Sequence, residues 1–504
     1  MRLFNTLFFL GFLGLILWGC GGGGGDGGEG QRFFALTNSP EVVVGGIKGS
    51  VRDGATVLVR NLNTGQVRGT VASGAGSFII TLDGSIDDTF EISAPGVDVI
   101  VEVMSVSDVS SEVKQEIMSG AVRRNLAAFE GFPTAIEIRG NKAYVLNFFN
   151  RIEIFNLDQN PPQRIGEIVL PPESDPVAIA FLDDTLAYVV NNIGQSVALV
   201  NVETMQCELL IVRSDSVPPA TSICQNQVIT VDLKFFEDPS AIAIAPNGKV
   251  YVTNNNLDAS FDPKGNGFIT VINSETNLVI GRIDATRANS DGITAIDNKL
   301  YVVNSGDTDF DLVTEENSCD FDFPPSIDVI NAESDTITNT INIPLSAQNP
   351  NVCSPNRIEP TPDGKFGYMG LALVGALLKV NLENNTIING PSDPIIITPL
   401  DVFNFTADIK IRTDGLGLTA LFNTDQIAVF DTTTDEVNPF PFIAFFPAGT
   451  KAEDPDSEFF EGVQSLAIRP GIPGIDFQGA DIFFITAANS TTLGSINTEP
   501  LTSE

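Results

Sequence analysis

Three aspartates in one short stretch are spaced so that they could hold a cation together. Asp307, Asp309 and Asp311 take every second position of the segment "GDTDFD". This spacing lets a short loop present several carboxylate oxygens, which are the ligands that Ca²⁺ prefers. Asp258 and Asp262 lie in a second acidic stretch and could join them. We predict a Ca²⁺ site from these five residues. The alternative is a solvated acidic rim, because the central glycine and distal glutamate of the usual calcium loop are absent.

The chain contains no histidine, and this excludes much enzyme chemistry. Serine–histidine–aspartate triads, cysteine–histidine dyads and histidine-based zinc sites all need an imidazole. Carboxylate, lysine and calcium chemistry remain open. We therefore assign no catalytic residue, and Ca²⁺ is the one cofactor that the sequence suggests.

Acidic residues far outnumber basic ones. The chain has 64 Asp and Glu against 27 Lys and Arg, which gives a formal net charge of -37 at pH 7. Such a surface repels phosphate backbones and favours cations. Nucleic acid is therefore excluded as a partner.

Residues 1–20 have the pattern of an export signal. A positive charge at Arg2 precedes a short apolar stretch that ends at Cys20, and this stretch is too short to be a membrane span. Its last four residues, "LWGC", resemble the lipobox of bacterial lipoproteins, in which the cysteine is lipidated and becomes the mature N-terminus. The resemblance implies a lipid anchor on Cys20, followed by a glycine-rich tether over residues 21–40. We expect a cell-envelope location, at the outer membrane because Gly21 follows the cysteine; the face of that membrane stays open.

Four further cysteines suggest two disulfides. Cys207, Cys224, Cys319 and Cys353 are an even set in a chain that is expected to be exported. Their spacing lacks the C-x-x-C form of a zinc site. Three pairings are possible from the count alone.

The elements that must position these residues begin with a small β-domain over residues 41–107. Three strand-like runs within residues 55–82 are separated by the turns "NLNTG" and "SGAGS". The order of strands and turns resembles small β-sandwiches of the carboxypeptidase-regulatory-like or bacterial immunoglobulin-like kind, which implies a spacer or adhesion element. Residues 108–119 form a linker, in which "SSEVKQEIMSG" has the capping pattern of a short helix.

Residues 120–504 contain a repeat of strand pairs. The first pair reads "TAIEIRGNKAYVLN", "VAIAFLDDTLAYVVNN", "SAIAIAPNGKVYVTNNN" and "GITAIDNKLYVVNSG", and weaker copies begin at residues 357, 407 and 463. A second pair, such as "FITVINSETNLVIGRI" or "SIDVINAESDTITNTINI", follows most copies. Four strands in each of seven units predict an all-β fold: a small β-sandwich followed by a seven-bladed β-propeller.

The strands "YVLN", "YVVN", "YVTN" and "YVVN", with the later "VIN-(S/A)-E-(T/S)" strands, resemble the YVTN-type propeller repeat. The resemblance is to the YncE-like seven-bladed group of extracytoplasmic bacterial and archaeal proteins, and it is clearest in blades one to four. We expect each asparagine to end the second strand of its blade, to bond the turn and to tolerate a left-handed backbone. Because the seventh copy is one strand short, we predict that residues 120–128 supply its outer strand.

The repeat layout narrows the disulfide pairing. Cys207 and Cys224 fall in one insertion, which we place between strands three and four of blade two. Cys319 lies in the large loop of blade four, and Cys353 lies in the connection into blade five on the same face. The expected pairs are Cys207 with Cys224 and Cys319 with Cys353.

Two enlarged acidic loops, residues 254–267 and 304–326, open on the face where propellers usually bind ligands. The leading hypothesis is therefore a non-enzymatic binding or scaffold lipoprotein, anchored to the membrane by lipid, with a protein or glycan partner. One alternative is a calcium-dependent propeller hydrolase or lactonase. Another is the propeller subunit of a periplasmic quinone-cofactor dehydrogenase.

Overall fold

The computed structural model describes residues 33–37, 41–46, 49–52, 54–72, 76, 78–105, 122–148, 150–159, 161–216, 224–225, 227–311, 316–400, 403–437, 446–448, 461–469, 482–488 and 491–496. Within these ranges nearly all regular structure is β-strand, and one short 3₁₀ helix, η3 (Leu233–Phe235), is present. Apolar helices of membrane-spanning length do not occur in this part of the chain. Two compact units separate between residues 121 and 122.

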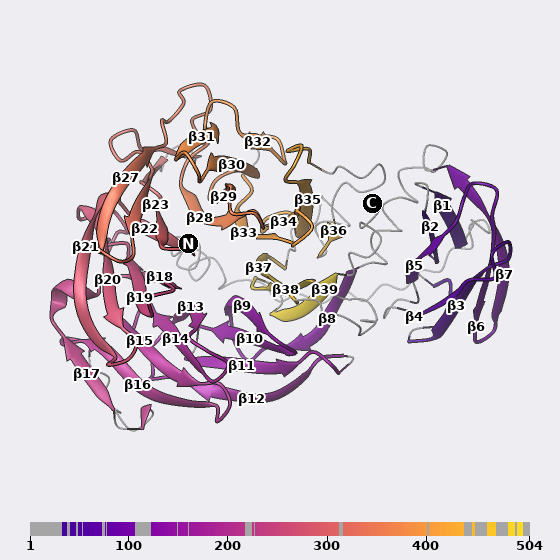
Figure 1. The fold of residues 1–504 in the computed structure, drawn as a ribbon, viewed down its shortest axis with the longest axis horizontal. Helices are drawn as coiled ribbons and strands as arrows, with labels where there is room; N and C mark the ends of the chain where they lie inside the picture. Colours follow the sequence, from indigo (N-terminus) through magenta and orange to yellow (C-terminus); the bar gives the residue numbers. More distant parts are fainter. Residues whose placement is uncertain are drawn as a thin grey trace, which may run out of the picture. The chain divides into compact units, whose positions relative to one another are not determined.

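The first unit is a β-sandwich, drawn in indigo and purple in Figure 1. Its strands run in the order β4-β3-β6-β7-β1-β2-β5. Their bounds are β1 (Phe33–Thr37), β2 (Glu41–Gly46), β3 (Thr56–Asn61), β4 (Val67–Val71), β5 (Phe78–Asp83), β6 (Thr89–Ala94) and β7 (Val97–Ser105). The long strand β7 pairs with β6 through residues 97–102 and with β1 through residues 103–105, so it links the two halves.

Alternating side chains build the sandwich core. Along β3 exposed and buried residues alternate strictly, and Val57 and Val59 point inward. They pack in one cluster with Val44 of β2 and Phe78 of β5, from the other half of the sandwich. The predicted tether is wrong at its C-terminal end, because "FFALT" at residues 33–37 pairs with β2 and β7 as strand β1. The predicted linker helix lies outside the described residues.

The second unit is a seven-bladed β-propeller (Figure 1). In each blade the first strand lies innermost, beside the first strands of the two neighbouring blades. Blades one to four comprise β9 (Pro133–Arg139), β10 (Lys142–Asn147), β11 (Arg151–Asn156) and β12 (Gln163–Val169); β13 (Pro176–Phe181), β14 (Leu186–Asn191), β15 (Ser196–Asn201), β16 (Gln206–Arg213) and β17 (Val228–Val231); β18 (Pro239–Ile244), β19 (Lys249–Asn254), β20 (Asn266–Asn273) and β21 (Leu278–Ala288); and β22 (Ser290–Ile296), β23 (Lys299–Asn304), β26 (Ser326–Asn331) and β27 (Thr336–Asn342).

The later blades keep the same plan with shorter outer strands. They comprise β28 (Pro355–Pro360), β29 (Phe366–Leu371), β30 (Ala376–Asn381), β31 (Thr386–Asn389) and β32 (Ile395–Ile396); β33 (Thr406–Ile411), β34 (Leu416–Leu421), β35 (Gln426–Asp431) and β36 (Phe446–Pro447); and β37 (Val463–Ile468), β38 (Ile482–Thr486), β39 (Thr492–Ile496) and β8 (Val122–Ala128). A separate hairpin, β24 (Thr308–Asp311) and β25 (Glu316–Cys319), is inserted in blade four.

The ring closes by joining the two ends of the propeller sequence in one blade. Strand β8, which precedes blade one, pairs antiparallel with β39 of blade seven. The prediction that this segment completes the last blade is confirmed. Closure of this kind ties residues that are distant in sequence into one sheet, so the last blade cannot form without the first residues of the repeat region.

Tyrosine connects successive blades on one face. The chain has five tyrosines, and each holds the same position of a second strand: Tyr144, Tyr188, Tyr251, Tyr301 and Tyr368. The buried Tyr251 hydroxyl donates to the Ala332 carbonyl at 2.8 Å and to Asp335 Oδ1 at 2.6 Å, in the β26–β27 turn of the next blade. Tyr188, Tyr301 and Tyr368 make matching bonds to the next blades, whereas Tyr144 packs on the Phe181 ring.

The turns between strands three and four, four of which receive these hydroxyls, explain the repeated "VIN-(S/A)-E-(T/S)" pattern. The residue that begins each turn accepts two backbone N–H groups through its side chain; these residues are Asn201, Asn273, Asn331, Asn381 and Asp431. Each turn ends in a left-handed residue with φ between 53° and 62°: Met205, Asn277, Asp335, Asn385 and Asp435. Asn and Asp suit both positions, because their short side chains cap backbone groups and tolerate positive φ.

Both predicted disulfides are present in the structure. The location given for the first was wrong: Cys207 lies on β16, the fourth strand of blade two, and Cys224 follows that strand. The tight turn that ends at Met205 already closes strands three and four, so the insertion comes after the blade. It leads to β17, which adds to β16 in parallel.

Candidate functional site

The two faces of the propeller differ in what they expose. Because the strands of a blade are antiparallel, loops between strands two and three open on the same face as the connections into the inner strands. We call this the loop face, and the opposite one, with the tight turns between strands one and two and between three and four, the turn face. Six large apolar side chains with at least 36% exposure lie in segments of the loop face: Phe132, Ile193, Leu233, Phe321, Phe323 and Phe403. In the described turns of the turn face, no large apolar side chain is exposed to this degree.

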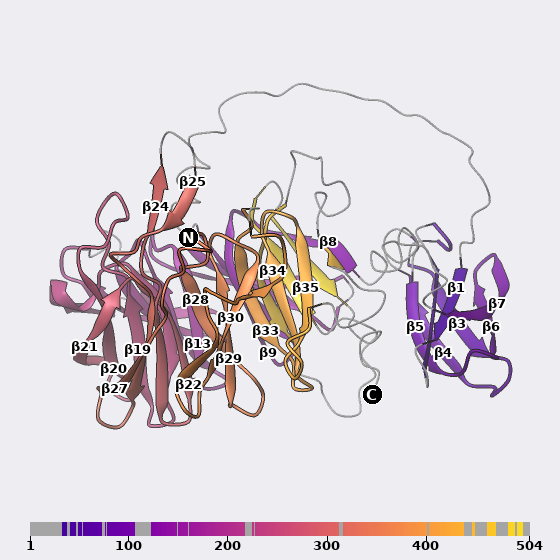
Figure 2. The same cartoon turned by 90° about the horizontal axis from the view of Figure 1, so that it is seen from above.

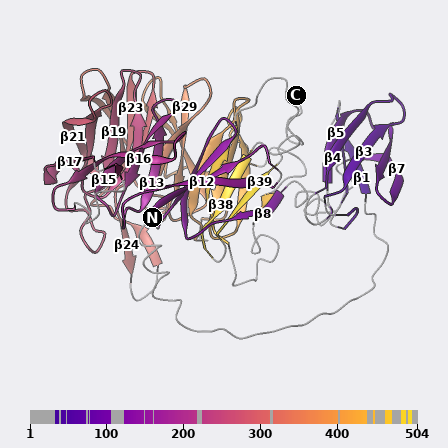
Figure 3. The same ribbon diagram turned by 90° about the horizontal axis from the view of Figure 1, so that it is seen from below.

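The most prominent feature of the loop face is the β24–β25 hairpin. Figures 2 and 3 show it standing out from the face of the propeller between β23 and β26. It belongs to a segment that we call the acidic arm, whose described residues are 307–311 and 316–323. These described residues hold five Asp and one Glu and no Lys or Arg. The arm is therefore a strongly anionic projection on one face of the ring.

The five predicted Ca²⁺ ligands are in two neighbouring loops of the loop face, and the structure describes the side chains of three of them, Asp258, Asp262 and Asp307. The Asp258 side chain accepts the Ser260 N–H at 2.8 Å, which forms a local turn. The Asp307 side chain accepts the Thr308 N–H at 2.8 Å. Among the described residues, no group of three or more acidic or cysteine side chains is placed to hold a metal ion. The side chains of Asp309 and Asp311 lie outside the described residues, so the Ca²⁺ site stays a prediction.

The asparagine that ends each Y-V-x-N strand is buried and joins separate segments of its blade. Asn254 Oδ1 accepts the Glu237 N–H at 3.0 Å ahead of the inner strand, and its Nδ2 donates to Thr270 Oγ1 on the third strand at 3.1 Å. Asn304 also bonds the third strand of its blade. The expected left-handed backbone is absent at these residues and occurs instead beyond the strand, as at Asn256. Pairing on both sides holds the asparagines in extended conformation, so their role is structural.

A network of charged side chains lies on the inner strands of blades five, six and one. Arg357 Nη2 on β28 is 3.1 Å from Asp408 Oδ1 on β33. Lys410 Nζ, on the same strand as Asp408, is 3.5 Å from Glu137 Oε1 on β9. Glu359, two residues after Arg357 on β28, interacts electrostatically with Lys410 and Arg357 but forms no ion pair within 4.0 Å with a described residue. Three neighbouring carboxylates and two cations thus line one side of the ring.

Burial and charge act against each other in this network. Burial alone would raise the pKa of the Asp408 carboxyl, but Lys410 and Arg357 lower it below its usual range. Asp408 Oδ2 also accepts the Ser465 hydroxyl at 2.7 Å, so its charge is well satisfied. Burial raises the pKa of Glu359, and the two nearby cations offset this only in part. Of Asp408 and Glu359, Glu359 is consequently the one that takes up a proton more readily.

The sequence analysis did not identify this network, because its residues are single departures from the repeat and not part of a repeated pattern. In most inner strands the positions on either side of the central Ile are small, as in "SAIAI". The copies "NRIEP", "ADIKI" and "AIEIR" carry charges there instead. An alignment of the seven inner strands shows which strands carry a charged residue where the others have a small one. Such an alignment would have found Arg357, Glu359, Asp408, Lys410 and Glu137.

The predicted lipidation site Cys20, the export signal and the glycine-rich tether up to residue 32 fall outside the described residues. The four remaining cysteines are all buried in disulfides. The structure therefore describes the two folded units and leaves the membrane anchor a prediction from sequence.

Comparison with known proteins identifies the fold. No family model and no curated protein matches the sequence, whereas 1211 chains of solved structures match this fold. The RRP9 WD40 repeats give a TM-score of 0.50 at 8% identity, over 75% of this chain and 98% of that one. U3-55K gives 0.49 at 8% identity, over 75% and 98%, and Kuenenia stuttgartiensis hydrazine synthase gives 0.47 at 14% identity, over 74% and 97%. At such identities the likeness bears on fold alone, and the WD40 match agrees with the propeller read from the sheet order.

Proposed function

We propose that this protein is a non-enzymatic binding module of the cell envelope that contacts its partner through the loop face of the propeller. The observation that carries this proposal is the difference between the two faces. Apolar side chains gather in the loops of one face, where they cost hydration free energy. The turns of the other face are polar and closed by their own side chains.

Attachment to the membrane is part of the proposal. The lipobox-like "LWGC" would place a lipid on Cys20, and residues 21–32 would serve as the tether. The two disulfides support an oxidising compartment, where such bonds persist. Labelling of the expressed full chain with a fatty-acid analogue tests this. Incorporation that is lost in Cys20→Ser is expected, and equal labelling of the variant would remove the anchor.

We assign the propeller to the YVTN-type, YncE-like group and the first unit to the regulatory-like or immunoglobulin-like spacers. The support is structural: the Y-V-x-N strand is the second of its blade, and its Tyr and Asn make the contacts that hold neighbouring strands and blades together. In this reading the sandwich is a spacer between the membrane and the propeller.

Binding of Ca²⁺ by the loop face stays part of the proposal. If Asp307, Asp309 and Asp311 share an ion with Asp258 or Asp262, Ca²⁺ must raise the melting temperature, because it binds the native state alone. A calcium-selective rise, measured beside Mg²⁺ and lost in Asp309→Ala, is expected. An unchanged melting temperature would leave the loops without a metal.

A second candidate function is hydrolysis, and the inner-strand network favours it. Glu359, on an inner strand, has a raised pKa and two cations nearby, which suits a proton donor. An ester or lactone substrate panel tests this candidate. Turnover that is lost in Glu359→Gln would favour it over pure binding, and the absence of turnover would exclude it for the classes tried.

Site-specific photo-crosslinking in cells tests the main proposal. A photoreactive residue at Ile193 samples the loop face, and one at Asp184 samples the turn face; both side chains are exposed. A discrete adduct from position 193 and none from position 184 is the expected result. Adducts from neither position, or equally from both, would overturn binding through the loop face.

A further inference from the structure

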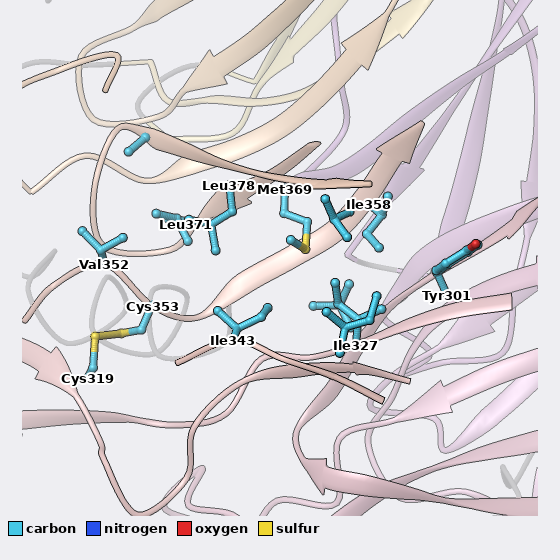
Figure 4. Packing of buried hydrophobic residues seen from close by; sticks show 14 of the residues in the cluster. Tyr301, Cys319, Ile327, Ile343, Val352, Cys353, Ile358, Met369, Leu371 and Leu378 are labelled. Atoms are coloured by element: carbon cyan, nitrogen blue, oxygen red, sulfur yellow. A yellow bond between two sulfur atoms is a disulfide. The ribbon is translucent and has the colours of Figure 1, made fainter. Parts of the chain in front are cut away.

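The acidic arm is fixed to the core of the propeller at its base. Cys319 at the end of β25 forms a disulfide with Cys353 in the connection into blade five. Both cysteines are almost fully buried, at 4% and 1% exposure. They extend the apolar cluster between blades four and five, where Val352 and Ile343 lie close to them (Figure 4). The arm therefore starts from a rigid support.

Backbone contacts add to this support. The Asp307 N–H donates to the Phe323 carbonyl, and the Asp320 N–H donates to the Asp307 carbonyl, both at 3.1 Å. The close approach of the two ends of the arm needs a glycine at position 306, which has φ +70°. A Cβ there would lie 2.2 Å from the Phe323 carbonyl oxygen. The base of the arm is thus held in one geometry before any partner arrives, which lowers the entropy cost of binding.

Apolar and acidic side chains alternate where the arm meets the loop face. Phe321 and Phe323 are 54% and 36% exposed, and they follow Asp320 and Asp322 in the sequence "DFDF". Two exposed phenylalanines on a fixed loop are unfavourable in water, and aromatic side chains of this kind supply much of the binding free energy in protein interfaces. The surrounding charge selects what can approach them.

We propose that the acidic arm binds a basic protein segment that also carries apolar side chains. The described residues of the arm include six acidic residues and no Lys or Arg, so a cationic segment complements the arm and is attracted over a Debye length. Phosphate-rich surfaces, including anionic lipid headgroups, are repelled by the same charge. The inference rests on the proposed use of the loop face and names the chemical class of the partner.

Binding of model peptides to the full chain tests the inference. The probe is a fluorescent 12-residue peptide of alternating lysine and leucine, and the comparison peptides replace every lysine by glutamate or every leucine by serine. We expect binding of the lysine–leucine peptide that weakens with salt, and at least tenfold weaker binding by Phe321→Ser/Phe323→Ser. Asp320→Asn/Asp322→Asn is expected to weaken binding in low salt and to flatten its salt dependence.

A matched variant separates the arm from general attraction to an anionic protein. Ile165 and Val169 are 42% and 44% exposed on β12, the outer strand of blade one, whereas the arm projects from blade four. Ile165→Ser/Val169→Ser should bind the lysine–leucine peptide like the wild type. Equal weakening by this variant, or equal affinity for the glutamate peptide, would overturn the inference. Binding to phosphatidylglycerol vesicles that needs Phe321 and Phe323 would overturn it in favour of a lipid surface.

The crosslinking experiment distinguishes failure of the inference about the arm from failure of the proposed binding role of the loop face. If position 193 gives a partner adduct but the arm variants bind the peptide like the wild type, the inference about the arm fails and the binding role of the loop face stands. If no loop-face adduct forms and peptide binding is unaffected by the arm variants, both fail.

Discussion

The turn face and the loop face of the propeller are formed by the same antiparallel blades, but their features are distributed differently. Features of the turn face recur from blade to blade, whereas the main features of the loop face occur once. On the turn face the same device repeats: an Asn or Asp caps the turn between strands three and four, and in four blades a tyrosine of the preceding blade bonds that turn. On the loop face the main features occur once. The projecting hairpin and the disulfide from Cys319 to Cys353 have no copy in other blades of the described chain.

The difference separates architecture from candidate function. A contact that must close a ring is needed in every blade, so selection for stability produces repetition. A binding site needs one copy, so it shows as a departure from the repeat. By this argument the Y-V-x-N motif is structural, and the acidic arm and the charged inner strands of blades five, six and one are the candidates for function.

The largest expected effect comes from the single disulfide on the loop face. Cys319→Ser/Cys353→Ser should lower the free energy of unfolding by about 2–4 kcal/mol, because the bond closes a loop of 34 residues in the unfolded chain. Urea unfolding under non-reducing conditions measures it. A loss below about 1 kcal/mol would mean that the base of the arm is held by backbone contacts alone.

The next largest effect should be a change of folding stability with pH, caused by Asp425 in the β34–β35 turn of the loop face. Its buried carboxylate accepts the N–H groups of Glu461 and Gly462 at 3.0 and 2.7 Å. Burial and the hydrogen bond with the Glu461 side chain raise its pKa from 3.8 to about 7. The folded state therefore binds the proton more tightly than the unfolded state, and stability should fall as pH rises from about 4 to about 7.

Asp425→Asn removes this titration and keeps one of the two acceptor oxygens, which accept from different N–H groups. The variant should lose the fall in stability between about pH 4 and about pH 7, on the order of 1–2 kcal/mol, that we expect of the wild type. Asp184→Asn, at an exposed aspartate of the turn face, should keep the wild-type slope. Identical pH profiles for Asp425→Asn and wild type would show that the carboxyl does not titrate in this range.

A smaller effect should distinguish tyrosines that bond the next blade from the one that does not. Tyr251→Phe leaves Asp335 and the Ala332 carbonyl without the hydroxyl, and should cost about 1 kcal/mol. The Tyr144 hydroxyl makes no hydrogen bond to a described residue, so Tyr144→Phe should cost less than about 0.5 kcal/mol. Thermal unfolding of both variants measures the difference, and equal costs would assign the stabilisation to ring packing instead of the hydroxyl.

The sequence predicted the repeated part of this molecule well, for a physical reason. Period-two alternation and Asn-rich turns recur in every copy, so weak signals add up until strand number, blade order and even the closing strand at residues 122–128 follow. The disulfide pairs followed from the same layout. The error in placing the first pair arose because a turn that ends at Met205 lacks the Asn or Asp of its counterparts.

The site could not be predicted to the same degree, because it depends on single residues without a pattern. Glu137 is 220 residues before Arg357 and still shares a network with it through Lys410 and Asp408. Only closure of the ring brings these strands together, and nothing local to "AIEIR" signals it. Exposure of Phe321 and Phe323 likewise depends on how the disulfide and Gly306 fix the arm, which local apolar patterning cannot reveal.

The smallest expected change in stability tests the comparison most directly. Phe321→Ser/Phe323→Ser should alter the free energy of unfolding by no more than about 0.5 kcal/mol, because both rings are exposed and contribute little to the core. Chemical denaturation beside the peptide measurement would then show lost binding without lost stability. If the variant is instead destabilised by more than about 1 kcal/mol, the two rings belong to the fold as the tyrosines do. The loop face would then have lost the feature that sets it apart from the turn face.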